Sequence, residues 1–387
     1  MNQSETVTAS IDANKALIMQ FGTSRFLQAH VDYFVSHSLA QGKSDAPVLV
    51  VQSSNSPAGS ARVVAMNSCT SYPVRIQGIK DGAVIDTQEQ ISAIFGALQA
   101  NSDWSKIVAF FCDQVTHVVS NTADQGFLLN DNDSLDSQLP KSFPAKLLVL
   151  LEARYRHSAE PVTIMPCELV ANNGDVLKAL VLSLAVDWQL DEKFMLWLAD
   201  CCLWVNSLVD RIVSESIEPL GAVAEPYALW AIENQNGLVL PCQHPAIRLV
   251  DDLLPLETLK LSVLNLSHSF MVDLWQQQDH SQVQTVVQAM QDPYLRGQLE
   301  QVLHNEVLPV LRAMQLGEDI EAYVASVIER FLNPFLAHKL EDIAQNHQSK
   351  IERRILPLVQ QAAQLLPELA MPKLRQCLAR NALTEGL

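Results

Sequence analysis

The chain has few basic residues and no run of them. Lysine and arginine together number 26 against 43 aspartates and glutamates, which gives a formal net charge of −17. A protein this acidic repels phosphate backbones and anionic lipid. We therefore expect neither nucleic-acid binding nor attachment to a membrane surface.

Cysteine pairs and long apolar runs are also lacking. The seven cysteines include no Cys-x-x-Cys pair, so we expect buried reduced thiols in a cytoplasmic protein and no metal site. The polar N-terminal segment has no apolar core and does not resemble a signal peptide. The longest apolar stretch, residues 194–209, is interrupted by Asp200 and Asn206 and is expected to form a buried helix rather than a membrane span.

What the chain does contain is an alternation of strand and helix patterns. Residues 16–21 form an apolar run that stops at Gly22, and residues 26–39 have helical spacing. Strand, tight turn and helix open a dinucleotide-binding βαβ unit. Further strands are expected at 47–51, 106–111, 115–119 and 162–165, helices at 90–98 and 143–156, and a hairpin at Lys80-Asp81-Gly82.

Beyond Asp251 and Asp252 the spacing is helical almost throughout. The sequence therefore predicts an α/β chain with two domains. The first, residues 1–250, is a Rossmann-type dinucleotide-binding domain, and the second, residues 251–387, is a mostly α-helical substrate and catalytic domain.

The first strand–helix turn is a candidate cofactor site. A dinucleotide site favours glycine at the positions of Gly22 and Ser24. Because the second of these is serine, the motif by itself also fits an ordinary strand–helix turn. Gln52 and Ser53 end the second strand, where an acid usually contacts the adenine ribose, and Arg62 follows; neither an NAD nor an NADP signature is clear. The candidate cofactor-binding residues are Phe21, Gly22, Thr23, Ser24, Arg25, Phe26, Gln52, Asn121 and Asp124.

The second candidate site is the stretch 260–268, which carries Lys260, Asn265 and His268 among mostly apolar residues. On an α-helix at about 100° per residue, His268 lies at about 80° and Asn265 at about 140° from Lys260, all on one side. An amine, an amide and an imidazole on one face suit proton transfer at a carbon–oxygen bond. A surface lysine with two satisfied polar groups would have the same spacing.

Motifs in the same order along most of the chain resemble those of the polyol-specific long-chain, or mannitol dehydrogenase, family, and most of all its hexuronate reductase branch (tagaturonate reductase or altronate oxidoreductase). They include FGTSRFLQAH at 21–30, VVSNTADQGF at 118–127, PCELVANNGDVLK at 166–178, KLSVLNLSHS at 260–269, RFLNPFLAH at 330–338 and SKIERRILP at 349–357. The K-x4-N-x2-H element is that family's catalytic signature.

The resemblance implies a role for each matching residue. Lys260 would be the general acid/base, Asn265 and Asn173 would polarise the reacting oxygen, and His268 would contact a substrate hydroxyl. Asp210 would lie near the lysine, and Arg330 and His338 would contact the distal end of the substrate, where a cation suits a carboxylate. No metal is implied.

The implied reaction is NAD-dependent interconversion of altronate and tagaturonate, with NADP not excluded. The alternatives are a fructuronate/mannonate reductase, a mannitol-type polyol dehydrogenase, or a catalytically silent homologue that binds a sugar acid. Two departures from the family pattern bear on this: Ser24 replaces the second glycine, and Asp124 stands where the family commonly has a glutamate. The expected partner is a small sugar acid, and the protein is expected to be a monomer or a small homo-oligomer.

Overall fold

The computed structural model describes residues 16–122, 126–135, 137, 139–277 and 282–383. The chain forms two compact units. The first contains the chain up to Ile76, Thr87–Ala224 and Ala228–Leu253; the second contains Leu254–Leu387 together with Gln77–Asp86 and Glu225–Tyr227. The sequence prediction had placed the last two segments in the first domain.

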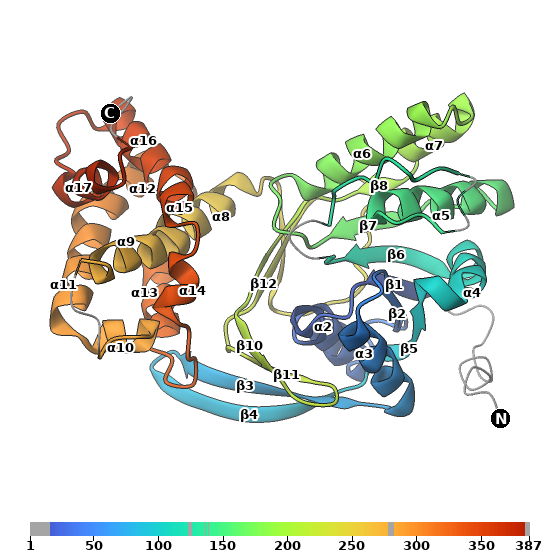
Figure 1. Ribbon diagram of the computed structural model, residues 1–387, viewed down its shortest axis with the longest axis horizontal. Helices are drawn as coiled ribbons and strands as arrows, with labels where there is room; N and C mark the ends of the chain where they lie inside the picture. The colour runs from blue at the N-terminus through green and yellow to red at the C-terminus, as the bar shows by residue number, and fades with distance from the viewer. Residues whose placement is uncertain (1–15, 123–125, 136, 138, 278–281, 384–387) are drawn as a thin grey trace. The chain divides into compact units, whose positions relative to one another are not determined.

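The first unit is built on a six-stranded parallel sheet (Figure 1). Its order, β5-β2-β1-β6-β7-β8, is that of the dinucleotide-binding fold, so the predicted Rossmann-type domain is confirmed. The strand order reverses between β1 and β6, which is where such sheets bind ligands. The strands are β1 (Leu17–Phe21), β2 (Val48–Gln52), β5 (Ile94–Gln99), β6 (Val115–Ser120), β7 (Thr163–Pro166) and β8 (Leu203–Trp204).

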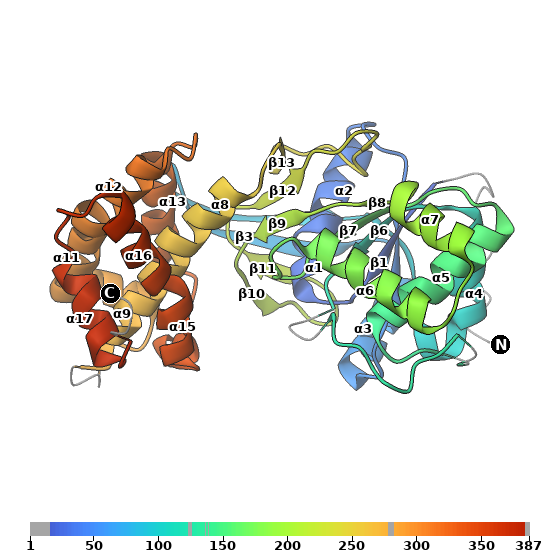
Figure 2. The same ribbon diagram turned by 90° about the horizontal axis from the view of Figure 1, so that it is seen from above.

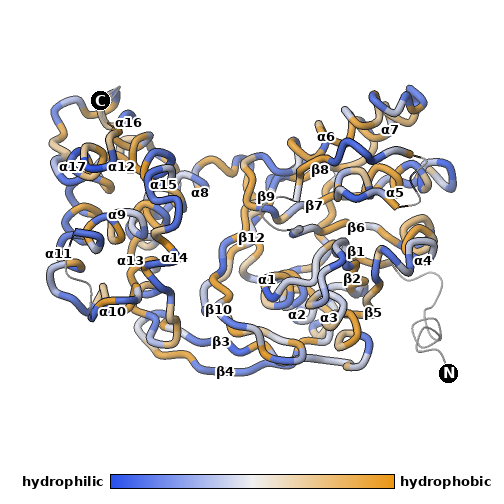
Figure 3. Tube along the Cα trace, in the orientation of Figure 1, coloured by the Kyte–Doolittle hydropathy of each residue, from blue (hydrophilic) through white to orange (hydrophobic). Residues whose placement is uncertain are grey.

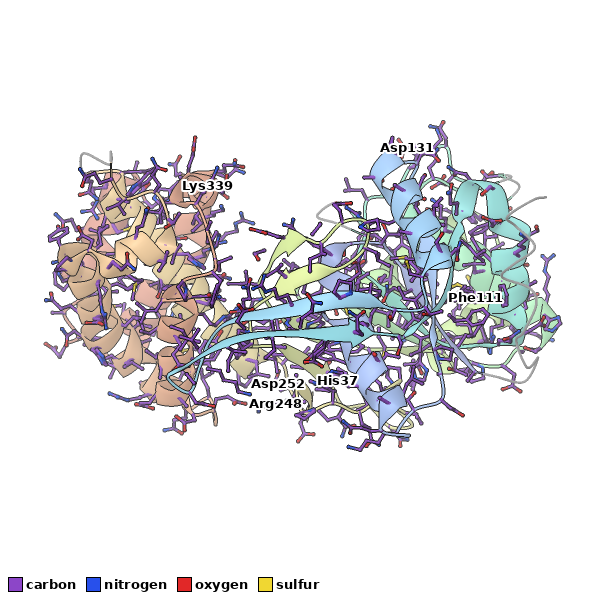
Figure 4. The ribbon with its side chains drawn as sticks, turned by 90° about the horizontal axis from the view of Figure 1, so that it is seen from below. His37, Phe111, Asp131, Arg248, Asp252 and Lys339 are labelled. Atoms are coloured by element: carbon purple, nitrogen blue, oxygen red, sulfur yellow. The ribbon has the colours of Figure 1, made fainter. Side chains whose placement is uncertain are left out.

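Apolar strands and the helices on them form the core of this unit. β1 and β2 are buried along their whole length, as strands covered on both faces must be. β6, which mixes apolar and polar residues along its trace in Figure 3, is buried at five of its six positions. Helices α4 (Ala100–Asp113), α5 (Phe143–His157) and α6 (Asn173–Asp187) pack side by side on the sheet (Figures 1 and 2). Phe111 of α4, labelled in Figure 4, is fully buried in this core.

Two smaller sheets accompany the parallel sheet, and of these only the end of β3 and the start of β4 belong to the second unit. Helix α2 (Val31–Ala40) is buried on nearly all sides, and the ring of Phe34 stacks on Trp230 at 6.5 Å between centroids. Trp230 belongs to the sheet β13-β12-β9, and the remaining strands form the sheet β10-β11-β3-β4. The elements not yet given are α1 (Arg25–Gln28), α3 (Pro57–Ser68), β3 (Tyr72–Lys80), β4 (Ala83–Ile91), α7 (Glu192–Asp200), β9 (Ser207–Asp210), β10 (Val213–Ser216), β11 (Ala222–Ala224), β12 (Leu229–Glu233) and β13 (Ile247–Val250).

Three sequence predictions in this part of the chain are wrong, whereas the predicted strands at 47–51, 115–119 and 162–165 and the predicted helix at 143–156 are confirmed. The predicted strand 106–111 lies in α4, where Ile107 and Phe111, four residues apart, form a buried helical stripe. The predicted helix 90–98 is instead the end of β4 and most of β5, and α7 ends at Asp200, before two strands. The hairpin between β3 and β4 is confirmed, since Asp81 and Gly82 both have positive φ values, 53° and 75°. Within the described residues, no helix is both long and apolar enough to cross a membrane.

The second unit is helical, as predicted. Helix α9 (Leu266–Trp275) is buried over almost its whole length, and α11, α14, α15 and α17 pack against it. The other elements are α8 (Leu254–Leu259), the π-helix η2 (Lys260–Asn265), α10 (Val286–Gln291), α11 (Pro293–Val302), the π-helix η3 (Leu303–Val307), α12 (Leu308–Met314), α13 (Ile320–Phe331), α14 (Leu340–Ala344), α15 (His347–Arg354), α16 (Leu356–Leu365) and α17 (Pro372–Arg380).

Gly22, directly after β1, provides a test of this fold. Its φ is 127°, and a Cβ atom there would lie 2.6 Å from the backbone oxygen of Asn121, after β6. We expect Gly22→Ala to lower the free energy of unfolding by about 1–3 kcal/mol more than Gly42→Ala, measured by chemical denaturation. Gly42 is the matched control, because its φ of 66° is also positive but no described atom lies within 4 Å of its Cβ position. Equal losses would contradict the close approach of the two strand ends.

Candidate active site

A cavity of about 590 Å³ lies in the first unit, where β1, β2 and β6 end. This is the switch point of the sheet, and the volume is that of a small-molecule or cofactor site. The lining residues are Gly22, Thr23, Ser24, Gln52, Ser53, Ser54, Ser56, Arg62, Asn121, Thr122, Gly126, Leu128, Leu129, Asn130, Lys141, Ser142 and Phe143.

The turn after β1 is fixed by backbone contacts to both neighbouring strands. The N–H of Gly22 donates to the carbonyl of Val51 at 3.1 Å, and the N–H of Asn121 donates to the carbonyl of Phe21 at 3.0 Å. Ser24, which stands where the family pattern has glycine, caps helix α1, because its Oγ accepts the N–H of Leu27 at 3.3 Å. The serine therefore has a local structural function in this turn.

Glu168 holds the segment after β6. Its carboxylate accepts hydrogen bonds from the hydroxyl of Ser120 at 2.9 Å and from the N–H and hydroxyl of Thr122, both at 3.0 Å. Burial raises the pKa of Glu168, although these donors oppose the shift. The carboxylate thereby fixes Thr122 at the cavity wall.

Five of the nine predicted cofactor-binding residues line the cavity: Gly22, Thr23, Ser24, Gln52 and Asn121. Phe21, Arg25 and Phe26 are not among the lining residues; Phe21 is fully buried, with its ring 5.1 Å from that of Phe143. Asp124 lies outside the described residues.

Sequence reasoning missed the part of the wall that comes from the starts of α3 and α5. Ser56 and Ser142 are the N-caps of these helices, each followed by a proline in the first turn, which is a readable helix-start signal. The cavity wall is basic: Arg62 and Lys141 line it, and none of the described lining residues is an aspartate or glutamate. Two helix N-termini and two cations fit the phosphates of a dinucleotide.

In the second unit, Lys260 and Asn265 are the two ends of the π-helix η2. The prediction of about 140° between them assumed an α-helix and is wrong. A π-helix has hydrogen bonds from residue i to i+5 and a wider turn, so residues five apart lie closer to one face than they would on an α-helix. Both side chains are half-buried, whereas Ser262, Val263 and Leu264 between them are buried.

His268 follows in α9 and is almost fully buried. Its ring lies 4.5 Å from that of Phe331 and 5.0 Å from that of His338, and its Nε2 has no hydrogen-bond partner among the described residues. Burial, and then the positive charges of His338, Arg330, Arg354 and Lys350, hold the pKa of His268 well below its usual value. The imidazole is therefore neutral at neutral pH, and its unpartnered Nε2 is buried.

Arg354 was missed as a site residue, although it lies in the motif at 349–357. Its Nη1 donates to Ser269 Oγ at 3.0 Å and to the carbonyl of Asn265 at 3.4 Å. Nearby on the same helix, Lys350 donates from Nζ to the carbonyl of Ile343 at 2.8 Å. These two cations surround His268 with positive potential.

Arg330 is engaged within the second unit. Its Nε and Nη2 donate to the two carboxylate oxygens of Glu225 at 2.9 and 2.8 Å, and both residues are buried. Its guanidinium also lies 4.4 Å from the ring centroid of Tyr227. The charge of Arg330 is thus compensated by a bidentate partner, which favours a structural role over the predicted contact with a substrate carboxylate.

Asn173 and Asp210 belong to the first unit and are both buried. The Nδ2 of Asn173 donates to the carbonyls of Pro166, Glu168 and Ser207 at 2.9–3.1 Å, and its Oδ1 accepts the N–H of Ser207 at 2.9 Å. Because both the Nδ2 and the Oδ1 of the amide already have hydrogen-bond partners, a structural role is favoured over the predicted contact with the reacting oxygen. Asp210 is the last residue of β9, paired with Leu229 of β12.

The two halves of the chain match two family models. Residues 16–240 match the mannitol dehydrogenase Rossmann domain, and residues 252–382 match the mannitol dehydrogenase C-terminal domain. The chain belongs to the mannitol dehydrogenase family. It is therefore an oxidoreductase that acts on a CH–OH group and uses a nicotinamide dinucleotide.

Curated relatives and solved structures agree with this family. The chain is 31% identical to the altronate oxidoreductase of Bacillus subtilis (strain 168), over 90% of this chain and 75% of the relative. It is 30% identical to that of Klebsiella pneumoniae (strain 342), over 91% and 77%. In fold it is similar to a D-sorbitol dehydrogenase (TM-score 0.82, 21% identity, 97% of this chain and 81% of that one) and to Pseudomonas fluorescens mannitol 2-dehydrogenase with NAD and D-mannitol (0.75, 18%, 99% and 80%).

The Arg330–Glu225 pair generates a stability prediction. We expect Arg330→Met to lower the free energy of unfolding by about 3–5 kcal/mol, because it leaves the buried Glu225 carboxylate without its cation. The double variant Arg330→Met/Glu225→Leu should recover most of this loss, since neither charge is then left unpaired. Chemical denaturation of both variants checks this; a single variant as stable as the unmodified protein would contradict the structural role.

Proposed function

We propose that this chain interconverts a sugar acid and its keto form, with altronate and tagaturonate as the first candidates. A polyol or sugar-acid substrate is what the names of the family and of the curated relatives support. The branch prediction made from the sequence motifs points to the same pair. Fructuronate/mannonate and neutral polyols such as mannitol are the alternative substrates.

The observation that carries the proposal is the π-helix at Lys260–Asn265. π-Turns are rare and frequently occur at functional sites. This one brings an amine and a carboxamide toward one helix face, directly before the buried His268. A surface lysine with no function would not need this geometry.

The proposed mechanism assigns a task to each of these side chains. A bound nicotinamide dinucleotide would supply or accept the hydride. In the oxidative direction, Lys260 takes the proton from the substrate hydroxyl while the amide of Asn265 donates a hydrogen bond to the same oxygen. In the reductive direction, protonated Lys260 returns a proton to that oxygen. His268, neutral and with an unengaged Nε2, orients the substrate through another hydroxyl.

The charges near His268 support a sugar acid over a neutral polyol. Arg354 and Lys350 act on His268, and their positive potential attracts a carboxylate, whereas burial lowers the pKa of His338 and keeps its ring neutral at neutral pH. Arg330 contributes less as a ligand because Glu225 already pairs with it. We therefore propose Arg354 and Lys350, in place of Arg330, as the residues that hold the substrate carboxylate, with His338 beside them.

A test of the acid/base assignment is Lys260→Ala. We expect kcat to fall by at least about 10²–10⁴-fold, because no other group takes the proton, while the Kd for the dinucleotide changes little. Turnover is followed by NAD(P)H absorbance with tagaturonate, fructuronate and fructose.

The matched control is Lys339→Ala, which removes an exposed lysine of the same unit (Figure 4) and should leave turnover unchanged. Full activity of Lys260→Ala would contradict the assignment of Lys260 as the acid/base. No turnover by the unmodified protein on any of the three substrates would favour the silent homologue.

Arg354→Met tests the substrate class. We expect kcat/KM for the sugar acid to fall by about 10- to 100-fold, the equivalent of one charge-assisted hydrogen bond, with little change for a neutral polyol. Arg353→Met is the control, because Arg353 is the exposed neighbour on the same helix. Equal losses of kcat/KM for the acid and for the polyol would show that Arg354 does not contact the carboxylate.

A further inference from the structure

Among the described residues that line the cavity of the first unit, none is a carboxylate at the place after the second strand where NAD sites have one. In dinucleotide-binding folds, an aspartate or glutamate after the second strand holds the 2′-hydroxyl of the adenine ribose. Here β2 ends at Gln52 and is followed by Ser53 and Ser54, and all three line the cavity. Asp131, next to the lining residue Asn130, is exposed and is not itself part of the lining (Figure 4).

Gln52 does not replace the missing acid, because its side chain is buried and already engaged. Its Nε2 donates to the carbonyl of Ser56 at 2.9 Å, and its Oε1 accepts from the hydroxyl of Ser60 at 3.3 Å. Gln52 thus braces the turn between β2 and α3. The hydroxyls of Ser53 and Ser54 make no hydrogen bond to a described residue, so both can donate to a ligand in the cavity.

Arg62, in the second turn of α3, is a positive residue at the wall where an NAD site would have a negative one. It is half-buried, lines the cavity, and has no hydrogen bond or ion pair with any described residue. The first turn of α3 contains no acidic residue, and the N-terminal end of this 12-residue helix is at the same wall. An uncompensated guanidinium, two free hydroxyls and the positive end of a helix dipole form a receptor for a phosphate rather than for a ribose hydroxyl.

We propose that this cavity selects NADP(H) over NAD(H), with Arg62, Ser53 and Ser54 holding the 2′-phosphate of the adenosine. The proposal rests on the proposed function, since it concerns the cofactor of that reaction. It departs from the NAD preference that the sequence resemblance implied. Arg62 is the residue that determines the preference, because its positive charge can pair with the 2′-phosphate, which NADP(H) carries and NAD(H) lacks.

The test measures binding by the full chain without substrate. Isothermal titration with NADPH and NADH gives two dissociation constants, and we expect NADPH to bind at least about 10-fold more tightly, the equivalent of one charge-assisted hydrogen bond. Arg62→Met should weaken NADPH by about 10- to 100-fold and NADH by less than about 3-fold. Lys43→Met, which removes an exposed cation of the same unit outside the cavity, should change neither constant.

Two further measurements keep the proposal falsifiable if Arg62→Met folds poorly. In the unmodified protein, 2′,5′-ADP should raise the Tm more than 5′-ADP at equal concentration, and the difference should shrink in high salt. Ser53→Asp should reverse the preference toward NADH, because its carboxylate repels the 2′-phosphate and accepts the ribose hydroxyl.

Tighter binding of NADH than NADPH, equal loss of both in Arg62→Met, or equal Tm shifts with the two ADP compounds would each overturn the proposal. Those results would leave the Lys260 mechanism intact. Failure of the chain to bind either dinucleotide would instead overturn the proposed function.

Discussion

The parallel pairing of β1 with β6 is the constraint on which the first unit depends. Their carboxyl ends approach so closely that a Cβ atom on Gly22 would lie 2.6 Å from the carbonyl oxygen of Asn121. Asn121 in turn donates from Nδ2 to the carbonyl of Cys167, after β7, at 2.8 Å. Because three strand ends are tied together at one edge, the backbone that lines the cavity is fixed before any ligand binds. Substitutions of the side chains at this edge can therefore change which ligand binds without changing the backbone of the sheet.

The second unit fixes its polar residues by a different device, a change in helix register. The π-helix turns Lys260 and Asn265 toward one face, while Val263 and Leu264 between them remain in the core. A π-turn is less favourable than α-helix, so it persists only where its surroundings compensate. Here α8 precedes it and the buried α9 follows it, so packing of the flanking helices holds the π-turn in place.

Much of the fold could be predicted from the sequence, and the failures have physical reasons. Runs such as 48–51, buried on both faces, are recognisable because every residue is apolar. The run 106–111 was predicted as a strand but lies in helix α4. Over six residues, a buried strand and a helix with one buried stripe can have the same apolar residues, so the pattern does not separate them. At the candidate site, the residue types at 260–268 were visible, but the π-register is set by tertiary packing. The pairing of Arg330 with Glu225, 105 residues apart, left no local signal.

The charge distribution reconciles an acidic protein with anionic ligands. A net charge of −17 opposes long polyanions, which sample the field of the whole surface. A small ligand inside a cavity experiences mainly the charges within about 8–10 Å, because salt screens exposed charges that lie farther away. The described cavity wall carries Arg62 and Lys141 in one unit, and Arg354 and Lys350 act on His268 in the other. Local cations, rather than the total charge, therefore decide which anions this chain can bind.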